Sequence, residues 1–395
     1  MTNTHVLPHL LPYAKQSIGA EDCAAVLEAL KGEKITRGEH TKRFEETIAA
    51  SCGAQYAVSF NSATTALYAA FFAAKVNEAD RFITTPNTFV ATAAAGMRLN
   101  VKPHFIDIER NSGNMSLEML QEAIQEPLSR GRFVIAPVHF AGIAIDMRRL
   151  ERSIKTPQAV IIEDAAHAIG SSYPTGEKVG CCAYSQMTIF SFHPAKTMTT
   201  GEGGMVTTND AELYHRLQLF RNNGIEREKP YLTATPAPGY YEINELGGNF
   251  HMTEMQAALG LSQYSRLESF IEKRRALVKR YRSHLAAHPC ITLFAEEFDE
   301  RSAYHLMCLQ IHFAKLKISK IELMNALKAK NIGSDVHYIP IYRLPVFAKL
   351  YGEKGAQFPN TEAYYEETLS VPLYYDLKEE EVDTICSILL SLLGG

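Results

Sequence analysis

The chain has 395 residues, 46% of them hydrophobic, and a formal net charge of −4. This length and apolar content predict a globular protein with two domains, or one large domain and a smaller one. Both charge signs are mixed along the chain, without the basic stripe typical of proteins that bind nucleic acid or anionic membranes. No stretch approaches the ~18–20 apolar residues that span a bilayer, so we expect neither nucleic-acid nor membrane partners.

The seven cysteines and 14 histidines show no metal-binding pattern. Neither CxxC nor HExxH occurs, and the adjacent Cys181 and Cys182 are poorly spaced for zinc, so we expect no metal. Free thiols indicate a reducing cytoplasm. The N-terminal segment MTNTHVLPHLLPYAK lacks a charged region followed by an apolar run, and no signal peptide is expected.

Short apolar runs alternate with stretches of helical spacing between about residues 55 and 210. The helical stretches include 62–76 and 116–128. The runs predict seven strands, at 56–60, 81–85, 102–108, 133–140, 159–166, 187–192 and 205–209. Strands that are apolar throughout and separated by helices predict an α/β fold with a mostly parallel sheet covered on both faces. In such sheets function gathers where strands end and helices begin.

A different pattern follows after residue 250. The stretch 253–287 predicts one long helix, or two with a break, joining the large domain to a smaller one. In the smaller domain, 303–313 suits a strand and 320–333 a helix closed by a glycine cap. We therefore place the domain boundary between 1–250 and 251–395. The earlier segment 226–241 has three prolines and weak periodicity, which predicts a loop.

The motif NSATT at 61–65 lies between a predicted strand and an Ala-rich helix. A helix N-terminus has unpaired N–H groups and the positive end of the helix dipole, which suits a phosphate. Alternatively, Ser62 or Thr64 simply caps the helix. A capped helix end can still bind an anion, so both interpretations stay open.

Asp164 comes at the end of an apolar run in the motif VIIEDAAHA. A carboxylate at the carboxyl end of a buried strand is costly unless something binds it. Three interpretations of Asp164 stay open: a structural ion pair, a cap of the following helix, or a partner for a protonated nitrogen of a ligand. His167 follows three residues later, about one helical turn away, and can share that site.

Lys196 follows the apolar run 187–190 and Ser191, and the turn GEGG (201–204) comes after it. Most lysines are solvated, but a lysine in a partly apolar site loses its proton more easily and becomes a nucleophile for carbonyl compounds. We interpret Lys196 as poised to form a Schiff base.

These three features together meet the requirements of pyridoxal phosphate. Its phosphate needs N–H and O–H donors, its ring nitrogen an acid, and its aldehyde a lysine. The segment 61–65 with Ser191, then Asp164 and Lys196, supply them. Phe89, after another strand end, either covers a face of the ring or packs in the core.

Six motifs in order resemble those of the DegT/DnrJ/EryC1/StrS aminotransferases, pyridoxal-phosphate enzymes that act on nucleotide-linked keto sugars. They are NSATTAL, ITTPNTFVATA, PVHFAG, IEDAAHAIGS, FSFHPAKTMTTGEGGMVTTND and GGNFHMTEMQAALGL. The resemblance extends from residue 11 to residue 383. It implies the aspartate-aminotransferase-like fold of the type I pyridoxal-phosphate enzymes: a large domain around a mostly parallel sheet and a smaller α+β C-terminal domain. It also implies a homodimer with shared active sites.

The resemblance assigns roles to single residues. Lys196 matches the lysine that holds the cofactor and later moves a proton, Asp164 the partner of the pyridine nitrogen, and His167 a residue beside the ring. Asn249 matches an asparagine that reaches the cofactor phosphate of the neighbouring subunit. The other implied cofactor contacts are Ala63, Thr64 and Ser191 at the phosphate and Phe89 over the ring.

Within the family, several stretches, DVHYIPIYRLP among them, resemble the aminotransferases of pseudaminic acid biosynthesis. This implies transfer of an amino group from L-glutamate to C4 of a UDP-linked 4-keto-6-deoxy-N-acetyl-hexosamine. Tyr13, His337 and Tyr338 are candidate contacts to that nucleotide sugar. Their alternative role is packing between the two domains.

The chain departs from the family pattern at His251, where arginine is common, and at Gly248 and Phe250, where LGGNFH replaces LGYNYR. The run 221–224 likewise reads RNNG in place of RSHG. These departures keep dTDP- or GDP-linked keto sugars open as substrates.

Other functions also remain open. A sugar dehydratase of the same fold carries histidine in place of the lysine, so Lys196 argues against it. A non-catalytic pyridoxal-phosphate sensor is a further alternative. A nicotinamide dehydrogenase or a nucleoside triphosphatase is disfavoured, because neither GxGxxG after an early strand nor GxxxxGK[ST] occurs.

Overall fold

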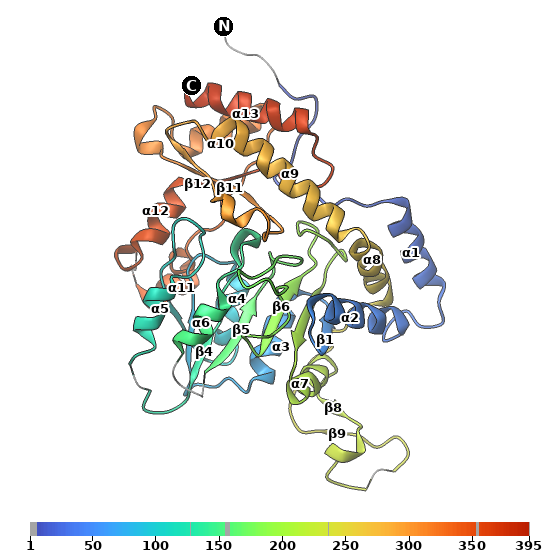
Figure 1. Cartoon of the computed structure of the whole chain (residues 1–395). Helices are drawn as coiled ribbons and strands as arrows, with labels where there is room; N and C mark the ends of the chain where they lie inside the picture. Colours follow the sequence, from blue (N-terminus) through green and yellow to red (C-terminus); the bar gives the residue numbers. More distant parts are fainter. Residues whose placement is uncertain (1–5, 127, 155–158, 236, 353–354, 395) are drawn as a thin grey trace.

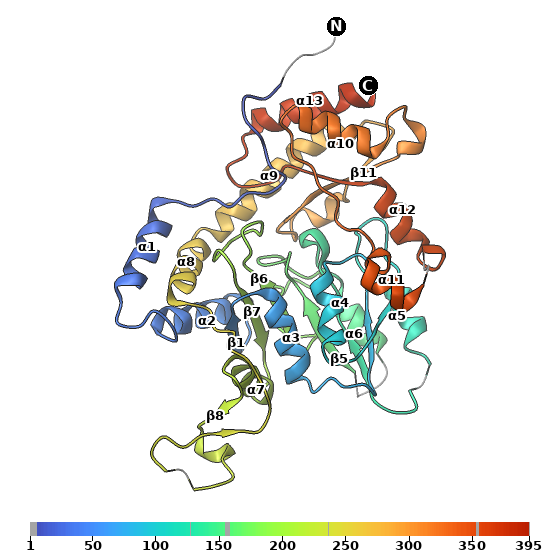
Figure 2. The same cartoon turned by 180° about the vertical axis from the view of Figure 1, so that it is seen from behind.

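A computed structural model describes residues 6–126, 128–154, 159–235, 237–352 and 355–394 (Figure 1). The start of the N-terminal segment, where no signal peptide was expected, lies outside these ranges. A seven-stranded sheet with its helices forms the larger part, and a three-stranded sheet lies in the C-terminal part above it (Figures 1 and 2). No helix in the described ranges is long and apolar enough to cross a membrane.

All seven strands predicted before residue 210 belong to one sheet. Their spatial order is β1 (Tyr56–Phe60), β7 (Gly204–Thr208), β6 (Met187–Ser191), β5 (Val160–Asp164), β4 (Phe133–Ile135), β2 (Arg81–Thr84) and β3 (Pro103–Phe105). Only β7 runs antiparallel to its neighbours, which confirms the mostly parallel sheet. Strand β4 is shorter than predicted, and Pro137, two residues beyond it, has no N–H for the ladder.

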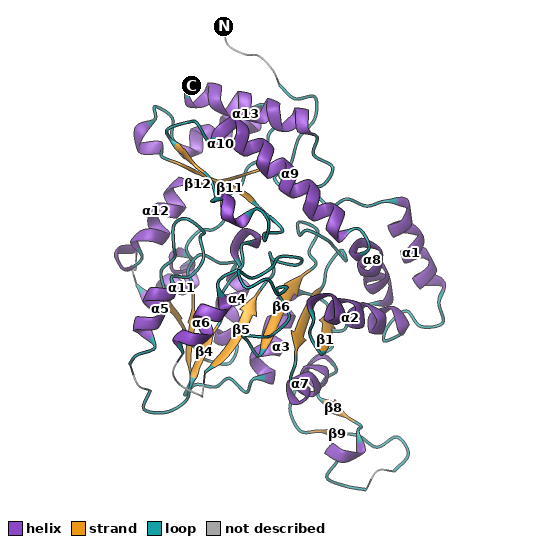
Figure 3. Cartoon of the chain, in the orientation of Figure 1, coloured by secondary structure: helices purple, strands orange, loops and turns teal. Residues whose placement is uncertain are grey.

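Successive residues of the central strands enter two different cores. Ile161 and Phe190 belong to one apolar cluster, whereas their neighbours Ile162 and Ile189 belong to the other. Side chains alternate across a strand, so a sheet buried on both faces needs strands that are apolar throughout. The helices of this larger part (Figure 3) are α1 (Ala20–Lys31), which packs on α8 away from the sheet, α2 (Glu39–Cys52), α3 (Ala63–Ala73), α4 (Val90–Met97), α5 (Leu117–Ala123), α6 (Met147–Ser153), α7 (Ala211–Arg221) and α8 (Glu254–Tyr264).

The helical stretch 253–287 forms two helices, α8 and α9 (Leu267–Leu285), separated at Ser265 and Arg266. Helix α8 packs against α1 and α2, whereas α9 packs against α13. The division of the chain at residue 250 remains a prediction. The C-terminal part contains an antiparallel sheet of β10 (Ile291–Thr292), β11 (Met307–Ile311) and β12 (Thr368–Val371), with helices α10 (Lys320–Ala329), α11 (Pro345–Tyr351), α12 (Pro359–Glu367) and α13 (Glu379–Leu393).

The segment predicted as a loop at 226–241 lies in an arm that projects from the body (Figure 1). Its base is a short antiparallel pair, β8 (Ile225–Glu226) and β9 (Glu242–Ile243). One turn of 3-10 helix lies inside the arm. The 3-10 turns of the described chain are η1 (Phe140–Gly142), η2 (Lys229–Tyr231), η3 (Glu296–Phe298), η4 (Phe313–Lys315), η5 (Ile341–Arg343) and η6 (Gly355–Gln357).

The predicted glycine cap at the end of 320–333 is wrong. Helix α10 ends at Ala329, and Asn331, not a glycine, adopts a positive φ of 63°. Gly333 has another purpose: its N–H donates to the Leu11 carbonyl at 2.7 Å, and a Cβ there would lie 2.9 Å from that oxygen. The glycine therefore permits the N-terminal segment to pass close by.

The register of the sheet positions the predicted phosphate seat. Gly204 pairs with Phe60 of β1 on one side and with Ser191 of β6 on the other. A Cβ on Gly204 would lie 2.5 Å from the carbonyl oxygen of Ser62. Only glycine here lets the start of α3 approach the end of β6.

We predict that Gly204→Ala destabilises the protein by about 1–3 kcal/mol, because the added methyl group forces the start of α3 away. Urea denaturation followed by circular dichroism measures the loss. Gly32→Ala is the control, since Gly32 has an ordinary φ of −66° and ends an exposed helix. Equal stability of Gly204→Ala and wild type would show that the loop has room to move.

Candidate active site

A cavity of about 820 Å³ opens at the carboxyl ends of β1, β5 and β6, facing the C-terminal part. Every residue that the sequence singled out for a site lines it. These residues are Tyr13, Ala63, Thr64, Phe89, Asp164, His167, Ser191, Lys196, Asn249, His337 and Tyr338. The fold thus brings together segments separated by more than 300 positions, although the role of each residue remains a prediction.

The start of α3 forms one end of the cavity. Ser62 is the N-cap residue, and its hydroxyl accepts a hydrogen bond from the N–H of Thr65 at 3.2 Å. The capping interpretation is therefore right for Ser62. The N–H groups of Ala63 and Thr64 belong to the first turn and have no acceptor within the helix. With the Ser191 hydroxyl across Gly204, they make a donor-rich end that suits a phosphate.

Asp164 is the last residue of β5 and is 4% exposed. Its two carboxylate oxygens accept hydrogen bonds from the Thr92 hydroxyl at 2.5 Å and from the Ala166 N–H at 3.0 Å. Both partners are neutral groups. The carboxylate is therefore available to a cationic group in the cavity, such as a protonated ring nitrogen.

Lys196 lies in the turn that follows β6, where its N–H donates to the His193 carbonyl at 2.8 Å. Burial lowers the pKa of its amine to about 8, against the opposing attraction of Asp164. An ordinary lysine is almost fully protonated at pH 8, whereas about half of the Lys196 amine is free at this pH. The amine is thus a competent nucleophile for a carbonyl carbon.

His167 is buried between Ala141 and Tyr338. Its Nδ1 accepts the N–H of Ala141 at 3.2 Å, and its Nε2 lies 3.0 Å from the Tyr338 hydroxyl. Burial and nearby Lys196 hold the pKa of this imidazole well below its usual range, so the ring is neutral. Since Nδ1 is an acceptor, Nε2 carries the proton and donates to Tyr338.

The remaining wall of the cavity is formed by Phe89, by Tyr13 from the N-terminal segment, and by His337 and Tyr338 from the C-terminal part. Phe89 is 58% exposed, which excludes the core-packing alternative. Tyr13 packs against His337, with ring centroids 5.3 Å apart, and the Nδ1 of His337 lies 2.8 Å from the Ser370 hydroxyl. Tyr13, His337 and Tyr338 therefore pack against neighbouring segments and face the cavity at once.

Sequence reasoning missed His305. Its Nε2 lies 3.4 Å from the Nζ atom of Lys196, and its ring centroid lies 4.4 Å from that of His167. The residue lies just before β11, in the stretch 303–313 that was predicted only to form a strand, and no motif there indicates a functional residue. Only the packing of the C-terminal part on the large sheet brings it to the lysine.

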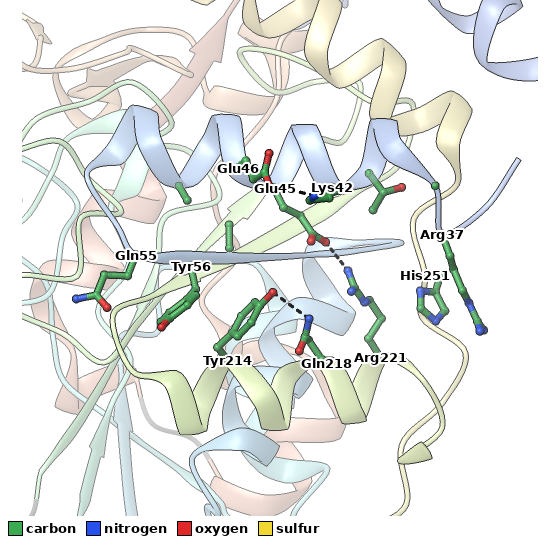
Figure 4. Close-up of a pocket in the computed structure, with 14 residues that line it drawn as sticks. Arg37, Lys42, Glu45, Glu46, Gln55, Tyr56, Tyr214, Gln218, Arg221 and His251 are labelled. Atoms are coloured by element: carbon green, nitrogen blue, oxygen red, sulfur yellow. Dashed lines mark hydrogen bonds and ion pairs between the residues drawn. The ribbon is translucent and has the colours of Figure 1, made fainter. Parts of the chain in front are cut away.

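A second pocket, of about 570 Å³, lies between α2, β1 and α7 (Figure 4). Arg221 forms an ion pair with Glu45 there. His251 belongs to this pocket rather than to the lysine cavity, and its Nε2 lies 3.2 Å from Asn222 Oδ1. Burial, with Arg221 and Arg37, lowers the pKa of His251 to about 4. The ring is therefore neutral, so pH-dependent binding by His251 is not expected near pH 7.

The departures at Gly248 and Phe250 are coupled. A Cβ on Gly248 would lie 2.4 Å from the ring of Phe250, so the ring occupies the space of the missing side chain. Phe250 lines the lysine cavity together with Asn249, which is exposed at its rim.

A nucleophilic lysine, a buried carboxylate and an anion seat in one cavity of this fold define a pyridoxal-phosphate enzyme. The sequence matches the DegT/DnrJ/EryC1/StrS aminotransferase family over residues 16–390. The chain belongs to this family, which confirms the resemblance, and it is an aminotransferase that uses pyridoxal phosphate.

Curated relatives match over nearly the whole chain. The spore coat polysaccharide biosynthesis protein SpsC of Bacillus subtilis is 34% identical over 389 residues, which are 98% of this chain and 98% of the relative. A UDP-4-amino-4,6-dideoxy-N-acetyl-beta-L-altrosamine transaminase of Campylobacter jejuni is 33% identical over 384 residues, 97% of this chain and 98% of the relative.

Solved structures agree in fold. Helicobacter pylori PseC, an aminotransferase involved in the biosynthesis of pseudoaminic acid, has a TM-score of 0.87 at 29% identity, covering 98% of this chain and 99% of that one. The pyridoxal-phosphate form of the putative sugar aminotransferase Spr1654 of Streptococcus pneumoniae has a TM-score of 0.86 at 27% identity, with the same coverage.

We predict that Asp164→Asn lowers the pKa of Lys196 by about one pH unit below its value of about 8, because the carboxylate favours the charged amine. Free amine then forms at lower pH. Competitive labelling with acetic anhydride across pH 5–10, with Lys196 followed by peptide mass spectrometry, measures the midpoint in the full chain without cofactor. Glu202→Gln, which removes one charge at the rim of the same cavity, should leave the midpoint in place.

Proposed function

We propose that the protein transfers an amino group from L-glutamate to C4 of a UDP-linked 4-keto-6-deoxy-N-acetyl-hexosamine, as in pseudaminic acid biosynthesis. The placement of Lys196, Asp164 and the start of α3 in one cavity carries this proposal. The names of the Campylobacter relative and of the Helicobacter structure support the choice of sugar.

The cavity residues fit pyridoxal phosphate, which when bound supplies an electrophilic carbon and a ring that withdraws electrons. The N–H groups of Ala63 and Thr64 and the Ser191 hydroxyl hold the phosphate. Asp164 keeps a proton on the ring nitrogen. Phe89 and His167, which line the same cavity, would contact the ring.

Lys196 performs the proton transfers. Its free amine takes the proton from Cα of glutamate, and in the second half-reaction its ammonium returns a proton at C4 of the sugar. A pKa of about 8 suits both tasks near neutral pH. The same lysine disfavours the dehydratase alternative, whose members carry histidine there.

We further propose that Tyr13, His337 and Tyr338 contact the nucleotide sugar, since they line the side of the cavity formed by the C-terminal part. Asn249 at the rim is the candidate contact between subunits of a homodimer with shared sites. The seven cysteines are all free thiols, which fits a cytoplasmic enzyme.

The experiment that tests the reaction follows the visible absorbance of the protein loaded with pyridoxal phosphate. L-Glutamate should bleach the band, and the UDP-4-keto sugar should restore it. Restoration by a dTDP- or GDP-linked keto sugar alone would replace the proposed substrate. A band that glutamate leaves unchanged would favour a binding protein without turnover. Lys196→Ala should show no such band.

We predict that Ser191→Ala raises the Kd for pyridoxal phosphate about tenfold, because a hydrogen bond to a charged phosphate is lost. Absorbance titration of the cofactor-free protein measures the constant. Ser153→Ala on α6, whose hydroxyl donates to the Leu150 carbonyl, is the matched control and should bind as wild type does. Unchanged binding by Ser191→Ala would place the phosphate elsewhere.

A further inference from the structure

His305 is a buried imidazole, and the amine of Lys196 is the one side chain among the described residues that lies within hydrogen-bond distance of it. Its Nε2 lies 3.4 Å from Nζ, while its Nδ1 is buried without a hydrogen-bond partner among the described residues. The residue is 3% exposed. A ring needed only for packing would be served by an apolar side chain, which leaves no unpaired polar atom.

The backbone of His305 is fixed from two sides. Its N–H donates to the carbonyl of Ala141, within the η1 turn of the large part, at 2.9 Å. Its carbonyl accepts from Arg274 of α9 at 3.2 Å, and the same Nη1 also reaches the carbonyls of Tyr304 and Leu373. Arg274 is itself 1% exposed. The ring is therefore held at the lysine by a rigid frame.

The protonation of the pair follows from its surroundings. Burial and neighbouring Lys196 hold the pKa of His305 well below its usual range, so the ring is neutral. A lysine ammonium has three donors and no acceptor. While Lys196 is charged, Nε2 of His305 must accept, and its ring proton stays on Nδ1. The other charged and titratable groups that face this pair are Asp164, which attracts the charge of Lys196, and His167, Arg274 and His337, which act on His305.

We propose that His305 is a positioning residue for Lys196: its Nε2 accepts a hydrogen bond from the lysine ammonium, stabilises the charged form and holds Nζ inside the cavity. Asp164 stabilises the same charge from the sheet, and His305 does so from the C-terminal part. The proposal concerns the lysine itself, and its importance for turnover rests on the proposed function.

Two similar substitutions separate this role from packing. His305→Gln places an amide oxygen near the position of Nε2, whereas His305→Asn reaches only the position of Nδ1. Acetic anhydride labelling of Lys196 in the full chain without cofactor gives the midpoint of amine release. We expect His305→Gln to keep the wild-type midpoint and His305→Asn to lower it by about one pH unit, because the ammonium loses its acceptor.

A midpoint unchanged in His305→Asn overturns the proposal, and so does an equal shift in both variants. His312→Asn is the control: His312 stands at the other end of β11, bound to Glu367 and Thr292, and should leave Lys196 unaffected. Circular dichroism confirms that each variant is folded.

The protonation state of His305 can also be measured in the wild-type protein, which makes the test independent of whether the variants fold. The ¹⁵N resonances of His305 at pH 6.5 should show a neutral ring with its proton on Nδ1. A proton on Nε2, or a charged ring, overturns the proposal. Failure of the proposed function is recognised separately, by a visible band that glutamate does not bleach or that the UDP-4-keto sugar does not restore, while the labelling result still stands.

Discussion

The structure depends on the burial of Lys196, which must be deep enough to favour the neutral amine without making the charged amine too unstable to form. Burial alone would make the charged amine of Lys196 very costly. The carboxylate of Asp164, at the end of the neighbouring strand, offsets part of this cost, and the pKa of the Lys196 amine is about 8. The sheet order, with β5 beside β6, brings these two residues together. The donor-rich start of α3 is then placed by β7, which joins β6 to β1.

The strands could be predicted because a doubly covered sheet demands continuous apolar runs, and all seven runs became strands. The ends of the strands could not be predicted in the same way: β3 and β4 are shorter than their apolar runs, because apolar content does not report where the hydrogen-bonded ladder ends. The glycine at 333 follows the same logic, since a passing segment far away in sequence, not the helix, requires it. Positions after strand ends pointed to Asp164 and Lys196, whereas the roles of Asn249 and Tyr13 came only from the resemblance.

His305 shows the remaining limit of sequence reasoning. Local pattern places it at the start of a strand, and nothing nearby marks it as different from His312 at the other end of that strand. Its meaning arises from a long-range contact across 109 positions. The contact also depends on Arg274, which donates to three backbone carbonyls and has no carboxylate partner among the described residues. A buried arginine of this kind has no sequence signature.

The wall formed by Gly248 and Phe250 has a consequence for how such enzymes diverge. Because the phenylalanine ring fills the volume that a side chain at 248 would need, neither position can change freely while the other is kept. A tyrosine at 248 is tolerated only after the ring at 250 has moved, as the family pattern LGYNYR implies with an aromatic residue at both positions. Change at this edge of the cavity therefore proceeds in pairs, with strained intermediates between them. Relatives that differ here should fall into a few discrete combinations, and a single exchange should be a poor route from one substrate preference to another.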